Sequence, residues 1–359
     1  MNIGIREKFG QMIMLGLDVN EINDEIIEII KKYKIGGVIL YKSLYTDIDS
    51  MSSIINKLKK ININNIPLFI AIDQENGRVN RLPSEMERIY NPLKQVKTKN
   101  IKIIDECNKI TSKVLSQLGI NMNFAPVVDI NYFTNSKAIG DRAYGYNKED
   151  VIKYGLPMVK TLNNNNIISV IKHFPGHGLV DKDSHYLIPK IKNVGKMKDD
   201  LVIYEKAIKD GVDGIMVGHL RVKGYENKPA SINGKILKEL LIDRYNYNGL
   251  IITDDLRMNI LSKLYGIKNI VTECVKSGVN IMMIKYKNGD MNKLYSELYR
   301  MVDNKEIDNE LIDKSYNKII EIKNKYKVTN NIKDNKIDID NINEQIREVN
   351  KKIDSYDIM

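Results

Sequence analysis

Tryptophan is absent from the 359-residue sequence, and phenylalanine occurs only five times. Proteins that bind single-stranded nucleic acid stack bases on aromatic side chains in a basic groove. Here the basic residues are spread over many segments, and no basic cluster is interleaved with aromatic residues. The net charge of +10 therefore indicates a solvated basic surface, and we expect no nucleic acid partner.

Cysteine and long hydrophobic runs are also scarce. The two cysteines, Cys107 and Cys274, have no metal or redox spacing, and we expect both to be reduced and buried. Apolar runs such as 249–253 are shorter than the ~18 residues of a membrane-spanning helix, so we expect no membrane partner. The apolar stretch at 12–17 is too short for a secretory signal, and we expect a cytoplasmic protein.

Nucleotide-binding motifs and domain linkers are missing as well. Neither GxGxxG nor GxxxxGK[ST] occurs, which argues against a nucleotide, and we expect no cofactor. No Gly/Pro/Ser-rich stretch or charge run marks a boundary in the middle of the chain.

The chain does contain eight short, apolar, β-branched runs, most of them followed by a longer segment with helical periodicity. We place the strands at 11–18, 36–41, 67–73, 121–129, 167–173, 213–219, 249–254 and 279–285. The segments 21–34, 105–118, 148–162 and 235–245 have the spacing of crossover helices.

This alternation predicts an α/β fold, a single-domain (β/α)₈ TIM-type barrel over residues 1–327. An open doubly wound sheet or two smaller α/β domains are the alternatives, and one barrel is the simpler account. Residues 328–359 form a C-terminal tail, in which 339–353 has the pattern of one amphipathic helix that packs back or frays.

Polar residues stand at the ends of the predicted strands, where the catalytic groups of a parallel α/β barrel lie. They are Asp73, Asp129, Lys172, His173, His219, Asp254 and Asp255. Asp255 directly precedes a helical stretch, so capping of that helix competes with any catalytic role. For Asp254, still on the strand, capping is the weaker interpretation.

The most informative loop is KHFPGHGLVDKDSH, residues 172–185, which carries His173, His177 and His185. A surface loop with incidental histidines is one interpretation. A zinc site of these histidines with Asp183 is a second, but the spacing fits no compact metal motif, and we expect no metal. Acid/base chemistry is favoured, since Asp183 stands two residues before His185, where a carboxylate can orient an imidazole.

At these residues the sequence resembles glycoside hydrolase family 3, and within it the single-domain β-N-acetylglucosaminidases of the NagZ type. The resemblance covers roughly the first 300 residues, with the motifs in family order. They are FGQMIMLG from Phe9, DQENGRVNRL from Asp73, GDRAYG from Gly140, KHFPGHG from Lys172, DSH from Asp183 and ITDDLRM from Ile252.

The resemblance implies a retaining β-glycosidase on a (β/α)₈ barrel, with roles for matching residues. Asp254 would be the nucleophile, and His185 the acid/base with Asp183 as its partner. The −1 sugar would be held by Asp73, Arg142, Lys172 and His173, and His219 would border the pocket. Asn76 replaces a usual glycine, and asparagine tolerates the positive φ of that position better than most residues. Tyr144 replaces a usual Phe conservatively.

The implied function is exo-acting removal of terminal GlcNAc from peptidoglycan-derived muropeptides or disaccharides by a protein that we expect to be a monomer. A phosphorylase with the same Asp-His dyad and a β-glucosidase are alternatives within the family. Outside enzymes, a non-catalytic sugar-sensing barrel is the alternative, and intact Asp254, Asp183 and His185 argue against it.

Overall fold

The sheet of the protein consists of parallel strands, seen in a computed structural model that describes residues 3–62, 65–134, 136–180, 188–332 and 336–356. Each of the seven pairs of neighbouring strands is parallel. In the order of the sheet the strands are β10 (Met282–Lys285), β1 (Ile13–Leu17), β2 (Gly37–Leu40), β3 (Phe69–Ile72), β4 (Met122–Asn123), β5 (Ile168–Phe174), β7 (Gly214–Val217) and β9 (Leu250–Thr253).

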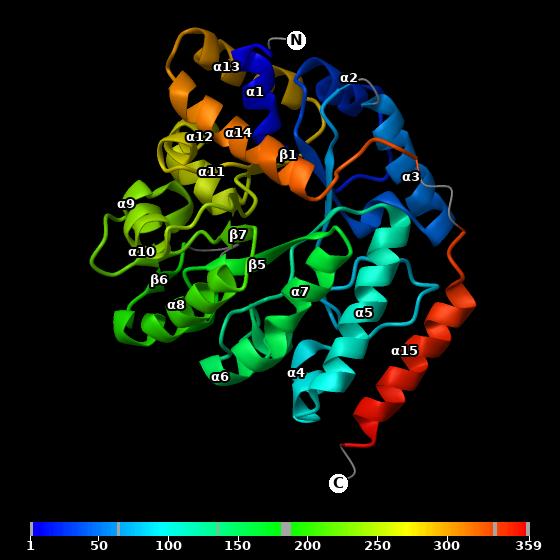
Figure 1. The fold of residues 1–359 in the computed structure, drawn as a ribbon. Helices are drawn as coiled ribbons and strands as arrows, with labels where there is room; N and C mark the ends of the chain where they lie inside the picture. The colour runs from blue at the N-terminus through cyan, green and yellow to red at the C-terminus, as the bar shows by residue number, and fades with distance from the viewer. Residues whose placement is uncertain (1–2, 63–64, 135, 181–187, 333–335, 357–359) are drawn as a thin grey trace.

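A single parallel bridge between Ile252 and Ile281 joins the two ends of this order. The sheet therefore closes on itself, and helices surround it (Figure 1). This is the (β/α)₈ barrel that the alternation of runs predicts, and each of the eight predicted strands contains or overlaps one observed strand.

The composition of the strands follows from their burial on both faces. Every residue of β1, β2 and β3 is buried, since the barrel interior covers one face and the helices cover the other. A strand that is buried on both faces favours apolar and β-branched residues at every position. The strands therefore stand out in the sequence as continuous apolar runs and not as an alternation of apolar and polar residues.

One strand is much shorter than predicted. The run 121–129 contributes only the two residues of β4, and the part beyond it contains Pro126, which has no amide hydrogen to donate to a ladder. Pairing resumes one residue later, where Val127 forms an isolated parallel bridge with Lys172. The chain therefore still arrives at the same end of the barrel as the other strands.

The helices begin at residues that cap them. The Asn23 side chain accepts a hydrogen bond from the Ile26 amide, and Asp47 forms a reciprocal capping box with Ser50. The larger helices are α1 (Ile5–Gln11), α2 (Asp24–Lys32), α3 (Ile48–Ile61), α4 (Pro92–Lys97), α5 (Ile101–Leu118), α7 (Pro157–Asn164), α8 (Val194–Lys209), α11 (Asn259–Tyr265), α12 (Ile267–Lys276), α13 (Met291–Asp303), α14 (Asn309–Lys325) and α15 (Ile339–Asp354).

The predicted helical segments 148–162 and 235–245 are each interrupted by a π-type turn, at Val151–Gly155 and Lys238–Ile242. The short pieces beside these turns are α6 (Lys148–Asp150), α9 (Gly234–Leu237) and α10 (Asp243–Tyr245). A second, two-stranded parallel sheet of β6 (Lys190–Ile191) and β8 (Arg221–Val222) is also present, and the sequence pattern did not indicate it.

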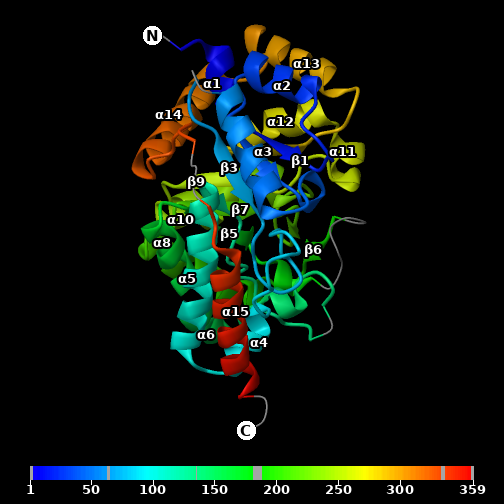
Figure 2. The same cartoon turned by 90° about the vertical axis from the view of Figure 1, so that its right-hand side faces the viewer.

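The tail helix α15 packs back on the body. It lies alongside α5 in both ribbon views (Figures 1 and 2). Its buried face consists of Ile342, Ile346, Val349 and Ile353, which recur at helical spacing. Of the two expectations for this segment, the packed helix is the one observed.

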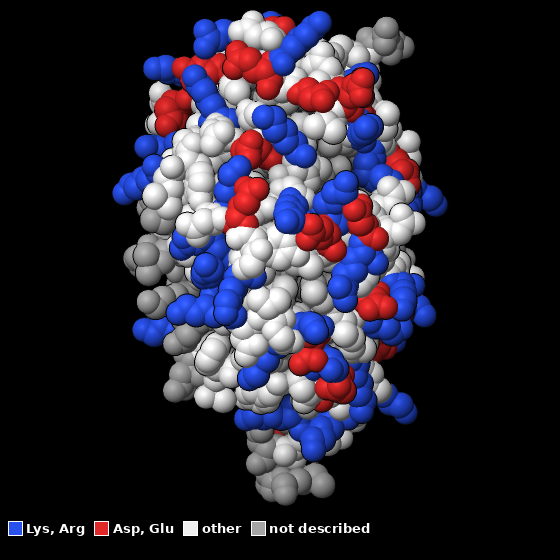
Figure 3. Space-filling model, turned by 90° about the vertical axis from the view of Figure 1, so that its left-hand side faces the viewer, with Lys and Arg blue, Asp and Glu red and all other residues white. Residues whose placement is uncertain are grey.

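The surface carries charges of both signs. On the face shown in Figure 3, Lys and Arg side chains are interspersed with Asp and Glu side chains. Within the described residues, no helix is both long enough and apolar enough to cross a bilayer.

Candidate active site

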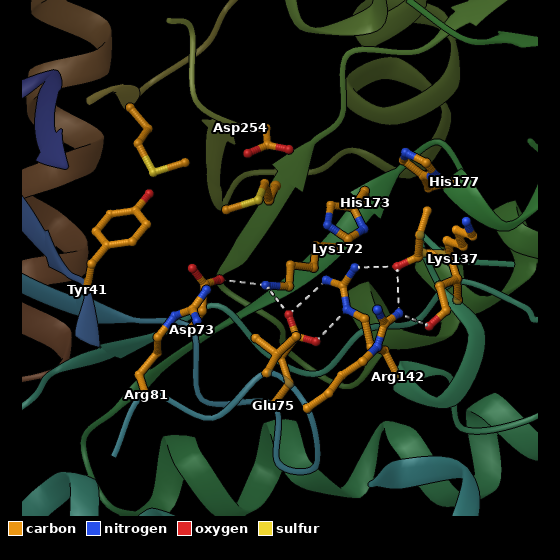
Figure 4. Close-up of a pocket in the computed structure, with 16 residues that line it drawn as sticks. Tyr41, Asp73, Glu75, Arg81, Lys137, Arg142, Lys172, His173, His177 and Asp254 are labelled. Carbon is orange, nitrogen blue, oxygen red and sulfur yellow. Dashed lines mark hydrogen bonds and ion pairs between the residues drawn. The ribbon is translucent and has the colours of Figure 1, made fainter. Parts of the chain in front are cut away.

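A cavity of about 280 Å³ lies at the carboxyl ends of the barrel strands (Figure 4). Six strands deliver side chains to it, either from within the strand or from the residue that directly follows it. The residues that line it are Tyr41, Asp73, Glu75, Arg78, Val79, Arg81, Lys137, Ala138, Ile139, Arg142, Lys172, His173, His177, Met216, Asp254 and Met283. Five of the residues predicted for the site therefore line the same cavity: Asp73, Arg142, Lys172, His173 and Asp254.

The floor of this cavity is a cluster of alternating charges. Lys172 Nζ lies 2.6 Å from Asp73 Oδ1 and 2.6 Å from Glu75 Oε1. Glu75 also accepts two hydrogen bonds from Arg142, from Nε at 2.7 Å and from Nη2 at 2.8 Å. Two carboxylates and two cations therefore balance each other in a largely buried cluster (Figure 4).

Burial and pairing act in opposite directions on these groups. Burial alone raises the pKa of Glu75, but the charges of Arg142 and Lys172 outweigh it and hold that pKa well below its ordinary value. Burial lowers the pKa of Lys172, and Asp73 and Glu75 reverse the effect, so the net shift is upward. Pairing thus favours the ionised form of Glu75 and the protonated form of Lys172. The Lys172 ammonium has a third hydrogen that these two carboxylates do not use.

Asp129 anchors the loop that follows β5. Its carboxylate accepts hydrogen bonds from the His173 amide at 3.1 Å, from His173 Nδ1 at 2.7 Å and from the His177 amide at 2.6 Å. Burial raises the pKa of Asp129, but the charge of His173 and these hydrogen bonds lower it by more. Because Nδ1 is held by Asp129, the other ring nitrogen of His173 is left for a ligand.

The glycines of the PGHG motif permit this arrangement. A Cβ on Gly178 would lie 1.8 Å from the Ile130 carbonyl oxygen, so only glycine fits there. Gly176 has φ of 131°, and a Cβ on it would lie 2.7 Å from the Asp200 carboxyl carbon. His177 is thereby turned toward the cavity, with Nδ1 buried and without a hydrogen-bond partner among the described residues.

The two consecutive aspartates after β9 have different environments. Asp254 lines the cavity, and its Oδ1 accepts only the adjacent Asp255 amide among the hydrogen bonds of the described residues. Asp255 Oδ1 accepts the backbone amides of Arg257 at 3.0 Å and of Lys285 at 3.1 Å. Asp255 therefore has a structural role in the turn before α11, but the capping interpretation is wrong, because the N-cap of α11 is Met258 and no side chain caps that helix. Asp254 is the carboxylate that faces the cavity.

The pKa values of the two groups diverge accordingly. Burial raises the pKa of Asp254, but His219, His173 and the Asp255 amide together lower it below its ordinary value. Burial raises the pKa of Asp255, and the Asp254 charge adds to that increase. Neighbouring carboxyl groups whose environments separate their pKa values often have distinct roles, and here Asp254 is the one with the lowered pKa.

His219 lies beside this pair rather than on the cavity wall. It is buried, with Nδ1 2.7 Å from Ser231 Oγ and Nε2 3.0 Å from the Asp255 carbonyl oxygen. It is not among the described residues that line the cavity. Its influence on Asp254 is electrostatic.

The predicted acid/base residue His185 and its partner Asp183 lie outside the described residues. The zinc interpretation therefore has two of its four ligands outside them as well. Among the residues that the structure describes, no three His, Cys, Asp or Glu side chains are grouped to hold a metal ion.

Sequence reasoning assigned no role to Glu75, although it lies in the quoted DQENGR motif. Its signal was a charged residue three positions beyond the end of the buried strand β3. Asp129 is one of the predicted strand-end residues, but its hydrogen bonds with His173 were not predicted. Asn76 has φ of 72°, which confirms the predicted tolerance for a positive φ at that position.

Comparison with known proteins places these motifs in a family. Residues 4–322 match the model of the glycosyl hydrolase family 3 N-terminal domain. Beta-hexosaminidase A of Pseudoalteromonas piscicida is 31% identical over 84% of this chain, which spans only 55% of that protein's length. Beta-hexosaminidase of Photobacterium profundum is 31% identical, over 68% of this chain and 73% of the relative.

A solved structure agrees. The glycoside hydrolase family 3 β-N-acetylglucosaminidase from Paenibacillus sp. str. FPU-7 superimposes with a TM-score of 0.88 at 27% identity, and the match covers 98% of this chain and 69% of that one. The family model, the curated relatives and the solved structure all indicate the same family. The chain belongs to glycoside hydrolase family 3.

Proposed function

We propose that the protein is an exo-acting, retaining β-N-acetylglucosaminidase that removes terminal GlcNAc from peptidoglycan-derived muropeptides. The observation that carries this proposal is the Asp254 carboxylate, which stands on the wall of a strand-end cavity with a lowered pKa. Retention of configuration needs an ionised carboxylate that attacks the anomeric carbon. The names of the relatives, beta-hexosaminidase and β-N-acetylglucosaminidase, support the choice of sugar.

The proposed reaction has two steps. Asp254 attacks C1 and forms a glycosyl-enzyme ester, while His185 gives a proton to the departing glycosidic oxygen as the C–O bond breaks. His185 then takes a proton from water, whose oxygen attacks C1 and releases Asp254. Asp183 would stabilise the imidazolium form of His185 in the first state.

The charged floor suits the recognition of one sugar. Asp73 accepts hydrogen bonds from hydroxyl groups, and Lys172 and Arg142 donate to hydroxyl and carbonyl oxygens. Glu75 holds both cations in place. A cavity of about 280 Å³ lies at the small end of ligand pockets, which favours a single terminal residue over an internal one.

Phosphorolysis is the second candidate, because the rim of the cavity is cationic. Arg78, Arg81 and Lys137 all line it, and the buried Nε of Arg81 has no hydrogen-bond partner among the described residues. Inorganic phosphate entering there would meet favourable charge.

The test is turnover of aryl β-N-acetylglucosaminide and aryl β-glucoside by the purified protein, with and without phosphate. We expect free GlcNAc with initial β configuration, at a rate that phosphate does not change. Formation of GlcNAc-1-phosphate would favour the phosphorylase, and faster release of glucose would favour a β-glucosidase. Absence of turnover with both sugars would refute the proposal and favour a sugar-sensing barrel.

A further inference from the structure

Two asparagines on one face of α15 bind the main chain of a segment more than 250 residues earlier in the sequence. Asn343 Oδ1 accepts the Glu87 amide at 2.7 Å, and its Nδ2 donates to the Glu85 carbonyl at 2.9 Å. Asn350, seven residues further along the helix, accepts the Tyr90 amide at 3.2 Å and donates to the Arg88 carbonyl at 2.8 Å. Each side-chain amide therefore replaces the backbone partner that a neighbouring strand would supply.

Further contacts hold the same segment to the end of the helix. Asp354 accepts the Tyr90 hydroxyl at 2.9 Å and pairs with Lys94 at 2.6 Å. Beneath these polar contacts lies the apolar face of α15, which is buried against the body. The helix thus holds residues 85–90 chiefly by their main chain, and the pair of Arg347 with the Glu87 side chain at 3.5 Å is a further, exposed contact.

The fixed segment belongs to the same loop as the floor of the cavity. Residues 73–91 connect β3 to α4, and they carry Asp73, Glu75 and Arg81 into the cavity. Ile89, between the two residues that Asn350 binds, accepts the Gly77 amide at 2.9 Å. Gly77 lies two residues from Glu75, and a Cβ on it would be 2.4 Å from the Asn91 Cβ. The two arms of the loop are therefore in direct contact.

Hydrogen bonds cross-link the arm of the loop that lines the cavity. Gln74 Nε2 donates to Asn80 Oδ1 at 2.7 Å, and Gln74 Oε1 accepts the Arg81 amide at 2.9 Å. The Glu75 amide donates to the Val79 carbonyl at 3.1 Å. A displacement at Ile89 should therefore reach the part of the loop that carries Glu75 and Arg81.

We propose that α15 is a positioning element of the active site, and that Asn343 and Asn350 are positioning residues that hold the 73–91 loop in its substrate-binding conformation. The kinetic part of this inference rests on the proposed function. Asp254 directly follows β9, and its backbone amide donates to the Val217 carbonyl, so it is held by the barrel strands and not by this loop. Loosening the loop should therefore impair sugar binding more than the chemical step.

The variants are Asn343→Ala, Asn350→Ala, the double variant, and Asn350→Asp. The matched control is Asn341→Ala on the same helix, because the Asn341 side chain accepts Gln345 within α15 and does not reach the loop. Asn350→Asp keeps the shape and the acceptor but not the donor to Arg88. If the side-chain amide matters, this variant resembles Asn350→Ala, and if only packing matters, it resembles the parent protein.

The first readout is amide hydrogen exchange, which needs no substrate. We expect faster exchange at 85–90 and also at 73–81 in the double variant, and no change in Asn341→Ala. The second readout is kinetics with the aryl substrate, in which KM rises about tenfold in the double variant and kcat changes much less.

Unchanged exchange at 73–81, or an unchanged KM beside faster exchange, would overturn the inference. If the double variant does not fold, the single variants and Asn350→Asp provide the same comparison. A parent protein without glycosidase activity would refute the proposed function alone, and exchange at 73–81 would still decide whether α15 controls the loop.

Discussion

Glu75 holds Arg142 in a two-pronged ion pair, with Nε to Oε2 at 2.7 Å and Nη2 to Oε1 at 2.8 Å. The same carboxylate contacts Lys172 at 2.6 Å, so one buried anion orients both cations of the cavity floor. A planar guanidinium that is fixed at two points presents its remaining hydrogens in a set direction. Glu75 therefore orients Arg142 and Lys172 for ligand binding without having to contact the ligand itself.

Replacing Glu75 with glutamine tests this role. The amide retains the size of the side chain but leaves two buried cations with one carboxylate fewer. Breaking a buried pair from one side typically costs about 3–5 kcal/mol, and we expect a loss of that order in the free energy of unfolding. Urea denaturation followed by circular dichroism provides the measurement.

The matched control is Glu87→Gln, since Glu87 pairs with Arg347 at 3.5 Å on the exposed surface. Solvent-exposed pairs contribute little to stability, so this variant should unfold close to the parent protein. Equal losses in the two variants would contradict the assignment of Glu75 as the anchor of Arg142 and Lys172.

Asp254→Asn tests the proposed nucleophile. Asparagine can keep the contact with the Asp255 amide but cannot form the ester, so we expect a folded protein that binds sugar with turnover lower by about three or more orders of magnitude. The assay is steady-state hydrolysis of aryl β-N-acetylglucosaminide, with sugar binding measured by calorimetry.

Asp18→Asn is the control for this change, because Asp18 also follows a barrel strand but pairs with Lys285 outside the cavity. It should lose far less activity than Asp254→Asn. Near-normal turnover of Asp254→Asn would remove Asp254 from the nucleophile role.

The strand positions could be predicted from the sequence because burial on both faces leaves a strong local signal. Runs such as the FIAI of β3 are apolar throughout, and polar residues follow them where the barrel opens. The end of β4 could not be placed in the same way, because the run continues in apolar residues while Pro126 interrupts the hydrogen-bonding ladder. The signal in the sequence was Pro126 itself, since a proline inside an apolar run argues against one continuous central strand.

The pairing inside the site was less predictable. Lys172 is 97 residues from Glu75 in the sequence, and nothing local to either shows that the 73–91 loop crosses beside β5. Likewise, the asparagines of α15 look like ordinary polar residues on an amphipathic helix. Their partners are backbone groups of a distant loop. Every residue type has such groups, so the residue types of that loop do not indicate the contact.

His185→Ala tests the proposed acid. Substrates with poor leaving groups need protonation of the glycosidic oxygen in the transition state, whereas activated aryl groups need little. We expect the loss of kcat/KM to grow with the pKa of the leaving phenol across a series of aryl β-N-acetylglucosaminides. A uniform loss over the series would count against His185 as the proton donor, and Asp183→Asn should show the same trend more weakly.

The lowered pKa of Asp129 predicts that the free energy of unfolding depends on pH. Its carboxylate is buried and accepts three hydrogen bonds from His173 and His177, and its pKa in the folded protein is lowered, because these partners outweigh the upward effect of burial. A carboxyl group with a lowered folded pKa stabilises the protein fully above its unfolded pKa of about 4, and this contribution is lost as the pH falls through the folded pKa. Asp129→Asn should therefore be markedly less stable than the parent protein at pH 7.

The difference in unfolding free energy between the two proteins should then narrow below about pH 4, where the parent protein loses the charge that the variant already lacks. Urea denaturation at several pH values between 3 and 7 measures it. Asp210→Asn is the control, since Asp210 forms an exposed pair with Lys206 one helical turn away, and it should differ little from the parent protein throughout. A difference for Asp129→Asn that stays constant down to pH 3 would mean that the side chain stabilises the loop without its charge, and the orientation of His173 would then rest on hydrogen bonding alone.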